Sequence, residues 1–220
     1  MKGLLIKDFK MMKSQKTFLV VMAGLTIIYS VMNKYSTFLM PYITMMVALF
    51  TISTISMDKQ NNGHAYLFAL PFSRKEYVKE KYCYCLFWGA LALIFTTILT
   101  YIAMVLHEAT VRLDEIGAVF LSTVIIILLL YAVMIPIQLK FSAEKSRMVF
   151  MGFFFAVFVC VYGVVRVVNT LGADIDIEGF LTRLTQQDVV MLIVLGLICS
   201  VVMMTISYMV SLRIMNKMEF

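Results

Sequence analysis

Charged residues are scarce in this chain. Only 15% of its 220 residues are Asp, Glu, Lys or Arg, whereas 62% are hydrophobic and the mean hydropathy is +0.92. An average soluble domain has about 25% charged residues, so this composition excludes an ordinary water-soluble fold and indicates a membrane protein. The net charge of +6 does not indicate nucleic acid as a partner, because the basic residues lie in short polar segments between apolar runs, where membrane topology explains them better.

Catalytic and metal-binding patterns are also missing from the sequence. It contains no H-E-x-x-H, no G-x-S-x-G and no P-loop, so we expect no catalytic residue, no bound metal and no ATP hydrolysis by this chain alone. The two histidines, His64 and His107, are expected on opposite sides of the membrane. No acid pair that could form a proton relay is found within the apolar runs. The cysteines form no Cys-x-x-Cys pair and are expected to be buried small apolar residues: Cys83, Cys85, Cys160 and Cys199.

What the sequence does contain is a series of long apolar runs. They predict an all-α membrane protein with six transmembrane helices, at about 17–32, 38–57, 82–106, 116–139, 148–168 and 189–212. The first run is short for a hydrocarbon core that requires about 20 residues. Pro136 is expected to kink the fourth helix or to end it early. Threonine and serine hydroxyls in the second run are expected to bond within their helix or to a neighbouring one.

The polar segments predict the orientation of these helices. Fifteen of the 19 lysines and arginines fall on the side that holds both termini, so we expect both termini in the cytoplasm. Residues 1–16 carry five lysines, and Leu5, Phe9 and Met12 follow one face of a helix. This pattern predicts an amphipathic helix at the membrane interface. The domain organisation that follows is the interfacial helix, a transmembrane domain over 17–212, and a cytoplasmic tail over 213–220.

Residues 58–81 form the longest polar interval between two long apolar runs and include five basic residues. A turn is followed by a short amphiphilic piece, His64–Leu70, which Pro71 ends. Ser73 and Glu76 have the spacing of a capping box, which satisfies free amide groups at a helix start. The helix begun there should continue unbroken into the third span. Such an ordered polar loop is typical of a docking surface.

The fifth run and the segment after it contain a second group of candidate residues. Arg166 is the one charge predicted inside a span, and it either reaches the headgroups or pairs with acids of the following segment and contacts a cargo. The acidic segment 170–188 is either a simple connector or a gate at the outer surface. The candidate residues for a cargo path or gate are Arg166, Phe154, Phe158, Asp176 and Glu178.

The polar interval also carries a resemblance to a known family. An acid with a polar turn, a glycine, an apolar patch ending in Leu-Pro and a Ser-Arg-Lys-Glu helix start occur here as Asp58, Gly63, Leu67–Pro71 and Ser73–Glu76. This pattern resembles the membrane subunits of ABC-2 type exporters, particularly the small six-span bacterial permeases. The opening MKGLLIKDFK and the short 140–147 loop are similar as well. The likeness is nearest to the permeases of phenol-soluble-modulin exporters, which move amphipathic peptide toxins out of Gram-positive cells.

The resemblance implies a function and partners. The chain would be the permease subunit of an ATP-driven exporter of amphipathic peptides or other amphiphiles in the bacterial plasma membrane. It would pair with a second permease copy, identical or related, and with two cytoplasmic ABC ATPase subunits that hold ATP and Mg. The N-terminal helix would be the elbow helix of the family. The polar interval would hold the coupling helix, with these residues at the ATPase: Asn61, Gly63, His64, Tyr66, Leu67, Phe68, Leu70, Pro71, Arg74 and Glu76.

Two other functions stay open on the sequence. A substrate-binding membrane component of an importer would also have six spans, and Arg166 with the acids near 174–178 would then contact a small ligand. A non-transporting immunity or scaffold protein would need no ordered cytoplasmic loop, so the capping box at Ser73 counts against that class.

Overall fold

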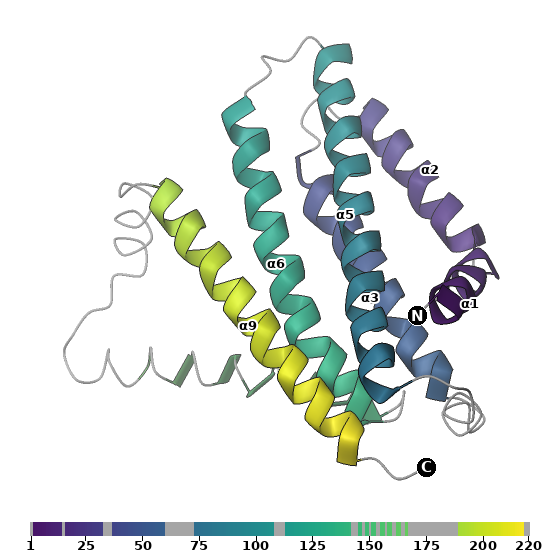
Figure 1. The fold of residues 1–220 in the computed structure, drawn as a ribbon. Helices are drawn as coiled ribbons and strands as arrows, with labels where there is room; N and C mark the ends of the chain where they lie inside the picture. Colours follow the sequence, from purple (N-terminus) through teal and green to yellow (C-terminus); the bar gives the residue numbers. More distant parts are fainter. Residues whose placement is uncertain are drawn as a thin grey trace.

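The computed structural model describes most of the chain. The described residues are 2–14, 16–32, 37–59, 73–107, 113–141 and 189–217, with short stretches at 145–146, 148–149, 151–152, 155–156, 158–159, 162–163 and 166. Within them the structure has six helices and no strand: α1 (Lys2–Ser14), α2 (Lys16–Met32), α3 (Leu39–Lys59), α5 (Arg74–Leu106), α6 (Leu113–Lys140) and α9 (Val189–Lys217) (Figure 1). The predicted all-α class is confirmed for this part of the chain.

Four of these helices are long and apolar enough to cross a membrane. They are Leu39–Lys59, Arg74–Leu106, Asp114–Lys140 and Met191–Lys217, which correspond to the predicted second, third, fourth and sixth spans. The first predicted span appears as a shorter apolar helix, Val20–Ser30 within α2. Ten of the 21 residues of the predicted fifth span and all of 170–188 lie outside the described residues, so the count of six spans stays a prediction.

The start of α5 confirms the predicted capping box. The Glu76 backbone N–H donates to Ser73 Oγ at 3.2 Å, and the Ser73 backbone N–H donates to Glu76 Oε2 at 2.9 Å. From this cap α5 continues for 33 residues to Leu106. The prediction of one unbroken helix from the polar interval into the third span is therefore correct.

Of the two outcomes expected at Pro136, the early end of the fourth span is wrong, whereas the kink stays a prediction. Helix α6 continues past the proline to Lys140. Proline removes one helical hydrogen bond and disturbs the preceding turn, but Ile135 and Leu139 on either side of it are both fully buried. Their packing against neighbouring helices holds the last turn in place.

The core lies between α3, α5, α6 and α9. Helix α3 packs against both α5 and α6, and α9 packs along α6. The main cluster of buried apolar residues includes Ile52, Ile55, Val78, Tyr131 and Ile135. Outside this core α9 is largely bare, with exposed side chains such as Met191 and Ile198, as expected of a helix that faces lipid.

Small and hydroxyl side chains allow the helices to approach closely. A Cβ on Gly196 would lie 2.9 Å from Ile125 Cδ1, so this glycine sets the spacing of α9 and α6. On α3, Thr51 Oγ1 donates to the Ala48 carbonyl at 2.8 Å, whereas Ser56 Oγ bonds to Gln138 of α6. The predicted use of hydroxyls both within a helix and between helices is confirmed.

Along α1 the buried side chains are Leu4, Asp8 and Met12, whereas Phe9 is 41% exposed. The face of α1 that packs on α3 and α5 therefore carries an acidic residue, Asp8, and the position of α1 at the membrane interface stays a prediction. One prediction about burial needs correction. Among the described cysteines Cys85 is buried, as expected, but Cys83 and Cys199 are exposed on outer helix faces.

Candidate functional site

Five charged residues from three helices meet where α3 ends and α5 begins. Lys7 and Asp8 come from α1, Asp58 from α3, and Glu80 and Lys81 from α5; we call these five residues the ionic cluster. Asp8, Glu80 and Lys81 are fully buried and Asp58 is 5% exposed, while the Lys7 side chain is 29% exposed. Charged side chains are almost never buried unless they are paired, so the partners within the cluster decide what it does.

Two lysines bridge two carboxylates in this cluster. Lys81 Nζ lies 2.7 Å from Asp58 Oδ2 and also donates to Asp8 Oδ2. Lys7 Nζ donates to Asp58 Oδ1 and lies 3.3 Å from Asp8 Oδ1. Each lysine therefore faces both aspartates, and α1, α3 and α5 are cross-linked by charge-assisted contacts.

Aromatic side chains complete the contact between α1 and α5. The Tyr77 hydroxyl donates to Asp58 Oδ2 at 3.0 Å, and the Tyr84 hydroxyl donates to the Asp8 carbonyl oxygen at 3.1 Å. Lys81 Nζ lies 5.4 Å from the Tyr77 ring centroid, within the range of a cation–π contact. The Phe9 ring packs edge-on to Tyr84, with centroids 5.6 Å apart. Aromatic side chains of α1 and α5 (Phe9, Tyr77 and Tyr84) therefore pack beside the ionic cluster.

The ionic cluster lies at the polar ends of the apolar helices. At about 1.5 Å per residue, the 33 residues of α5 extend about 50 Å, whereas a hydrocarbon core is about 30 Å thick. The sequence places the apolar part of this helix at 82–106, after Lys81, and the preceding span ends at 57, before Asp58. The charged residues thus lie where the two spans leave the apolar layer.

Two further residues fix the ends of segment 60–72 to other helices, and we call Lys59 and Arg74 the anchoring residues. Lys59 Nζ donates to the carbonyl oxygens of Leu139 at 2.6 Å and Phe141 at 3.0 Å. Arg74 Nη1 donates to the carbonyl oxygens of Met215 at 3.1 Å and Asn216 at 3.0 Å. The last carbonyls of a helix lack intrahelical partners and carry its negative dipole end, so a cation is the natural partner there.

Segment 60–72 is thus bracketed by residues that contact four other parts of the fold. Before the segment, Asp58 contacts α1 and Lys59 contacts the end of α6. After the segment, Arg74 contacts the end of α9 and Lys81 contacts α1 and α3. The ends of α3, α6 and α9 and the start of α5 gather at one end of the bundle (Figure 1). A force on the segment would therefore be transmitted to most of the described helices. Among the described residues no group of three His, Cys, Asp or Glu side chains could hold a metal ion.

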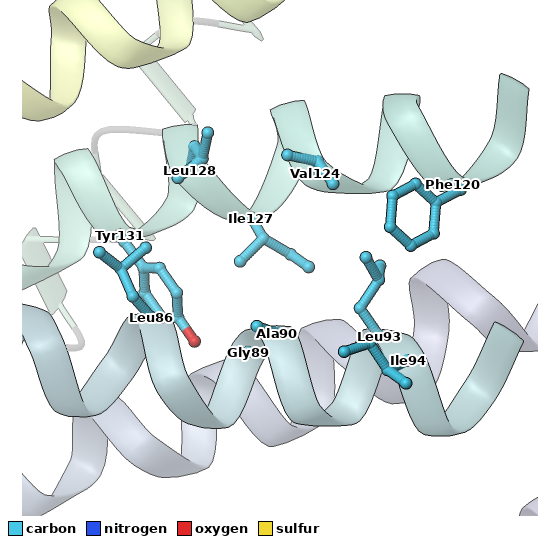
Figure 2. Close-up of a pocket in the computed structure, with 10 residues that line it drawn as sticks. All are labelled: Leu86, Gly89, Ala90, Leu93, Ile94, Phe120, Val124, Ile127, Leu128 and Tyr131. Carbon is cyan, nitrogen blue, oxygen red and sulfur yellow. The ribbon is translucent and has the colours of Figure 1, made fainter. Parts of the chain in front are cut away.

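A separate apolar cavity of about 230 Å³ lies between α5 and α6. Figure 2 shows the Tyr131 hydroxyl of α6 pointing toward Gly89 of α5. A Cβ on Gly89 would lie 2.8 Å from that oxygen, so the glycine leaves room for the tyrosine. The cavity is lined by Leu86, Gly89, Ala90, Leu93, Ile94, Phe120, Val124, Ile127, Leu128 and Tyr131.

Only part of the predicted site residues can be placed. Arg74 anchors the end of α9 and Glu76 belongs to the capping box, while the other predicted ATPase-contact residues, from Asn61 to Pro71, lie outside the described residues. Of the predicted cargo path, Arg166 and Phe158 are exposed, and the Phe158 ring stacks on Tyr162. Phe154, Asp176 and Glu178 lie outside the described residues, so the cargo path stays a prediction.

The ionic cluster is not among the site residues predicted from the sequence. Lys7 and Lys81 lie in basic segments that predict membrane orientation, and Arg166 is the one charge predicted within a span. Two signals were present: Asp8 has no acidic companion before Asp58, and Tyr77, Lys81 and Tyr84 share one helix face. Neither pattern shows burial by itself, because Asp8 and Lys81 are buried only once α1 packs on α5.

Comparison with known proteins identifies the family. The family model described as ABC-2 family transporter protein matches residues 3–216 of the chain. No curated protein and no solved structure matches the chain. The family match omits only two residues at the start and four at the end, and it agrees with the long apolar helices. The chain therefore belongs to the ABC-2 family of transporter proteins and is a membrane transport component of the permease type.

Proposed function

We propose that this chain is the permease subunit of an ATP-driven exporter, and that a separate ABC ATPase docks on segment 60–72. The family generally works with an ABC ATPase, and this chain has no P-loop of its own. The observation that carries the docking site is the anchoring of both ends of the segment, through Lys59 to α6 and through Arg74 to α9. A loop without a mechanical role has no need of such fixed ends.

The proposed mechanism is a movement of packed helices driven from this segment. ATP and Mg bind in the partner, whose closure displaces segment 60–72. Because Asp58 and Lys81 are paired with each other and with α1, α3, α5 and α1 move as one unit. The anchoring residues transmit the displacement to the ends of α6 and α9. Such small sliding of packed helices is an established kind of conformational change.

The full topology belongs to the same proposal. We infer six spans, with both termini and segment 60–72 in the cytoplasm of a bacterial cell and α1 lying at the inner membrane surface as an elbow helix. The distribution of lysine and arginine supports this orientation. The working unit would contain two permease chains, identical or related, and two ATPases, with the cargo passing between the permeases.

The proposed cargo is an amphipathic peptide, as moved by phenol-soluble-modulin exporters, or a similar amphiphile. The support is the abundance of large, adaptable apolar side chains, including 19 methionines and 17 phenylalanines. Several of them are exposed on the described chain, among them Met148, Met151, Phe155 and Phe158. A surface of this kind accepts apolar faces of varied shape better than it accepts ions or sugars.

The test is reconstitution of the chain with its matched ATPase in lipid nanodiscs. We expect the ATPase to co-purify with the intact chain and to hydrolyse ATP faster when an amphipathic helical peptide is added. Replacing residues 61–70 by a Gly-Ser linker of equal length should abolish both effects. A control chain with a Gly-Ser linker at 171–180 should still bind the ATPase. Undiminished ATPase binding after the 61–70 replacement would contradict the proposed docking site.

A further inference from the structure

Glu80 is the member of the ionic cluster that the lysines leave without a partner. Its side chain is fully buried, yet neither Oε1 nor Oε2 receives a hydrogen bond from any described residue. Lys81 Nζ is directed at Asp8 and Asp58 instead. An ionised carboxylate in this position would be a buried charge without a donor, which is among the costliest arrangements in a protein.

The neighbour of Glu80 across the helix interface is a second carboxyl group. Asp8 packs on the face of α5 that carries Glu80, because Asp8 contacts Lys81, the next residue, and Tyr84, one helical turn further on. Asp8 Oδ1 likewise has no hydrogen-bond donor among the described residues. Lys7 Nζ is 3.3 Å from that oxygen but its hydrogen bond goes to Asp58 Oδ1. Two carboxylates cannot bond to each other, because both are acceptors. One proton between them would supply the missing donor.

The charges of the cluster require the same proton. Lys7 and Lys81 contribute two positive charges, whereas Asp8, Asp58 and Glu80 contribute three negative charges if all are ionised. This count covers the charged residues of the cluster on each helix: Lys7 and Asp8 of α1, Asp58 of α3, and Glu80 and Lys81 of α5. The neutral hydroxyls of Tyr77 and Tyr84 donate elsewhere, to Asp58 and to the Asp8 backbone. One added proton makes the buried cluster neutral.

We propose that Asp8 and Glu80 form a proton-binding site in which the two carboxyl groups share one proton at neutral pH. The proton resides on Glu80, whose O–H donates to Asp8 Oδ1, since Asp8 is the acid that both lysines contact. Two carboxylates at one site repel each other, and a proton shared between them removes one of the two negative charges. Release of the proton to solvent breaks only that O–H bond and leaves two facing anions between α1 and α5.

The site makes the contact between α1 and α5 sensitive to pH. With the proton bound, Glu80 joins α1 to α5; without it, the two carboxylates repel each other and α1 is loosened. This inference does not depend on the proposed transport function, since it concerns only the chain itself. It can therefore be tested on the isolated full-length chain without an ATPase.

Infrared spectroscopy of the full chain in nanodiscs tests the site directly. A protonated carboxyl has a C=O stretching band that a carboxylate lacks, so the wild-type spectrum at neutral pH should contain one such band that Glu80→Gln removes. Asp8→Asn should also remove it, because the cluster without Asp8 is neutral only when Glu80 is ionised. The comparison with Asp8→Asn suffices if Glu80→Gln does not fold. A wild-type chain with no such band, or a band that persists in both variants, would overturn the proposal.

The pH dependence of stability gives a second readout. An unfolded glutamic acid ionises at about pH 4.3, whereas the folded chain keeps the proton, so folding takes up one proton above that pH. The folding equilibrium constant should then fall by up to about tenfold for each unit that the pH rises, until the folded site ionises. Glu80→Gln, which cannot ionise, should lose this slope and be relatively more stable at alkaline pH. The control Asp114→Asn, at an exposed acid, should keep the slope. An unchanged slope in Glu80→Gln would refute the site.

Discussion

Asp58 and Lys81 are 23 residues apart in sequence, but Asp58 Oδ2 and Lys81 Nζ are 2.7 Å apart in the fold. The two residues stand on either side of segment 60–72, so this ion pair fastens the ends of the segment to each other. Both side chains are buried, which places the pair in a medium where charges interact strongly. The pair joins the end of α3 to α5, and both residues also contact α1.

Removing the central cation should unfold the chain more readily. Lys81→Met leaves Asp8 and Asp58 buried without one of the two lysines that bridge them, and breaking a buried ion pair in this way costs about 3–5 kcal/mol. The expected result is a lower unfolding temperature in detergent or nanodiscs. Lys79→Met is the control, because Lys79 is an exposed lysine on the same helix and a surface substitution changes stability by about 0.5 kcal/mol or less. Equal effects of the two substitutions would contradict the central role of Lys81.

The anchoring residues should affect coupling more than stability. Lys59→Met and Arg74→Met each remove charge-assisted hydrogen bonds to two helix-end carbonyls, so each should cost about 1–3 kcal/mol. The double variant should still bind the ATPase through segment 60–72, yet peptide-stimulated ATP hydrolysis should fall several-fold. Lys75→Met serves as the control, because Lys75 is exposed beside Arg74. Full stimulation in the double variant would show that the segment acts without α6 and α9.

Helix start signals can be tested at Ser73. Replacing a capping serine by alanine typically costs about 0.5–2 kcal/mol. Ser73→Ala should remove the Oγ acceptor of the Glu76 N–H. The free energy of unfolding should fall by about 0.5–2 kcal/mol, which lowers the unfolding temperature. Glycine is a better capping residue than alanine, so Ser73→Gly should be milder. The two variants should differ in thermal unfolding by a few degrees, and a reversed order would speak against the cap.

Helix positions and helix starts were predictable because they depend on local sequence. Ser73 and Glu76 are three residues apart, and a capping box needs nothing beyond that spacing. The apolar runs likewise predicted α3, α5, α6 and α9 within a few residues, because lipid requires continuous apolar helices. The part of α5 before the apolar run, residues 74–81, could be predicted as well, since it contains no proline or glycine that would interrupt the helix.

The ionic cluster could not be predicted in the same way. Burial of Asp8 depends on α1 packing against α5, and the partners Asp8 and Lys81 are separated by 73 positions. A lysine in a basic segment has the same local pattern whether it faces water or a buried carboxylate. The inward face of α1 has the same cause, because the pairing of Asp8 with Lys7 and Lys81 turns that side toward α3 and α5.

The cavity between α5 and α6 allows a prediction with an internal check. Gly89→Ala places a methyl group 2.8 Å from the Tyr131 hydroxyl, and overpacking of this kind typically costs about 1–3 kcal/mol. Tyr131→Phe removes the oxygen, so the double variant should be more stable than the sum of the single effects predicts. This coupling is measured by a double-mutant cycle of thermal or chemical unfolding.

The control for that cycle is Gly117→Ala on α6. A Cβ there meets nothing within 4 Å, so alanine should be neutral or stabilising by up to about 1 kcal/mol through its higher helix propensity. If Gly89→Ala behaves like Gly117→Ala, the glycine does not set the approach of α5 and α6. If the cycle shows strong coupling, Gly89 and Tyr131 together fix the spacing of these two helices, and larger residues at position 89 become a means of wedging them apart.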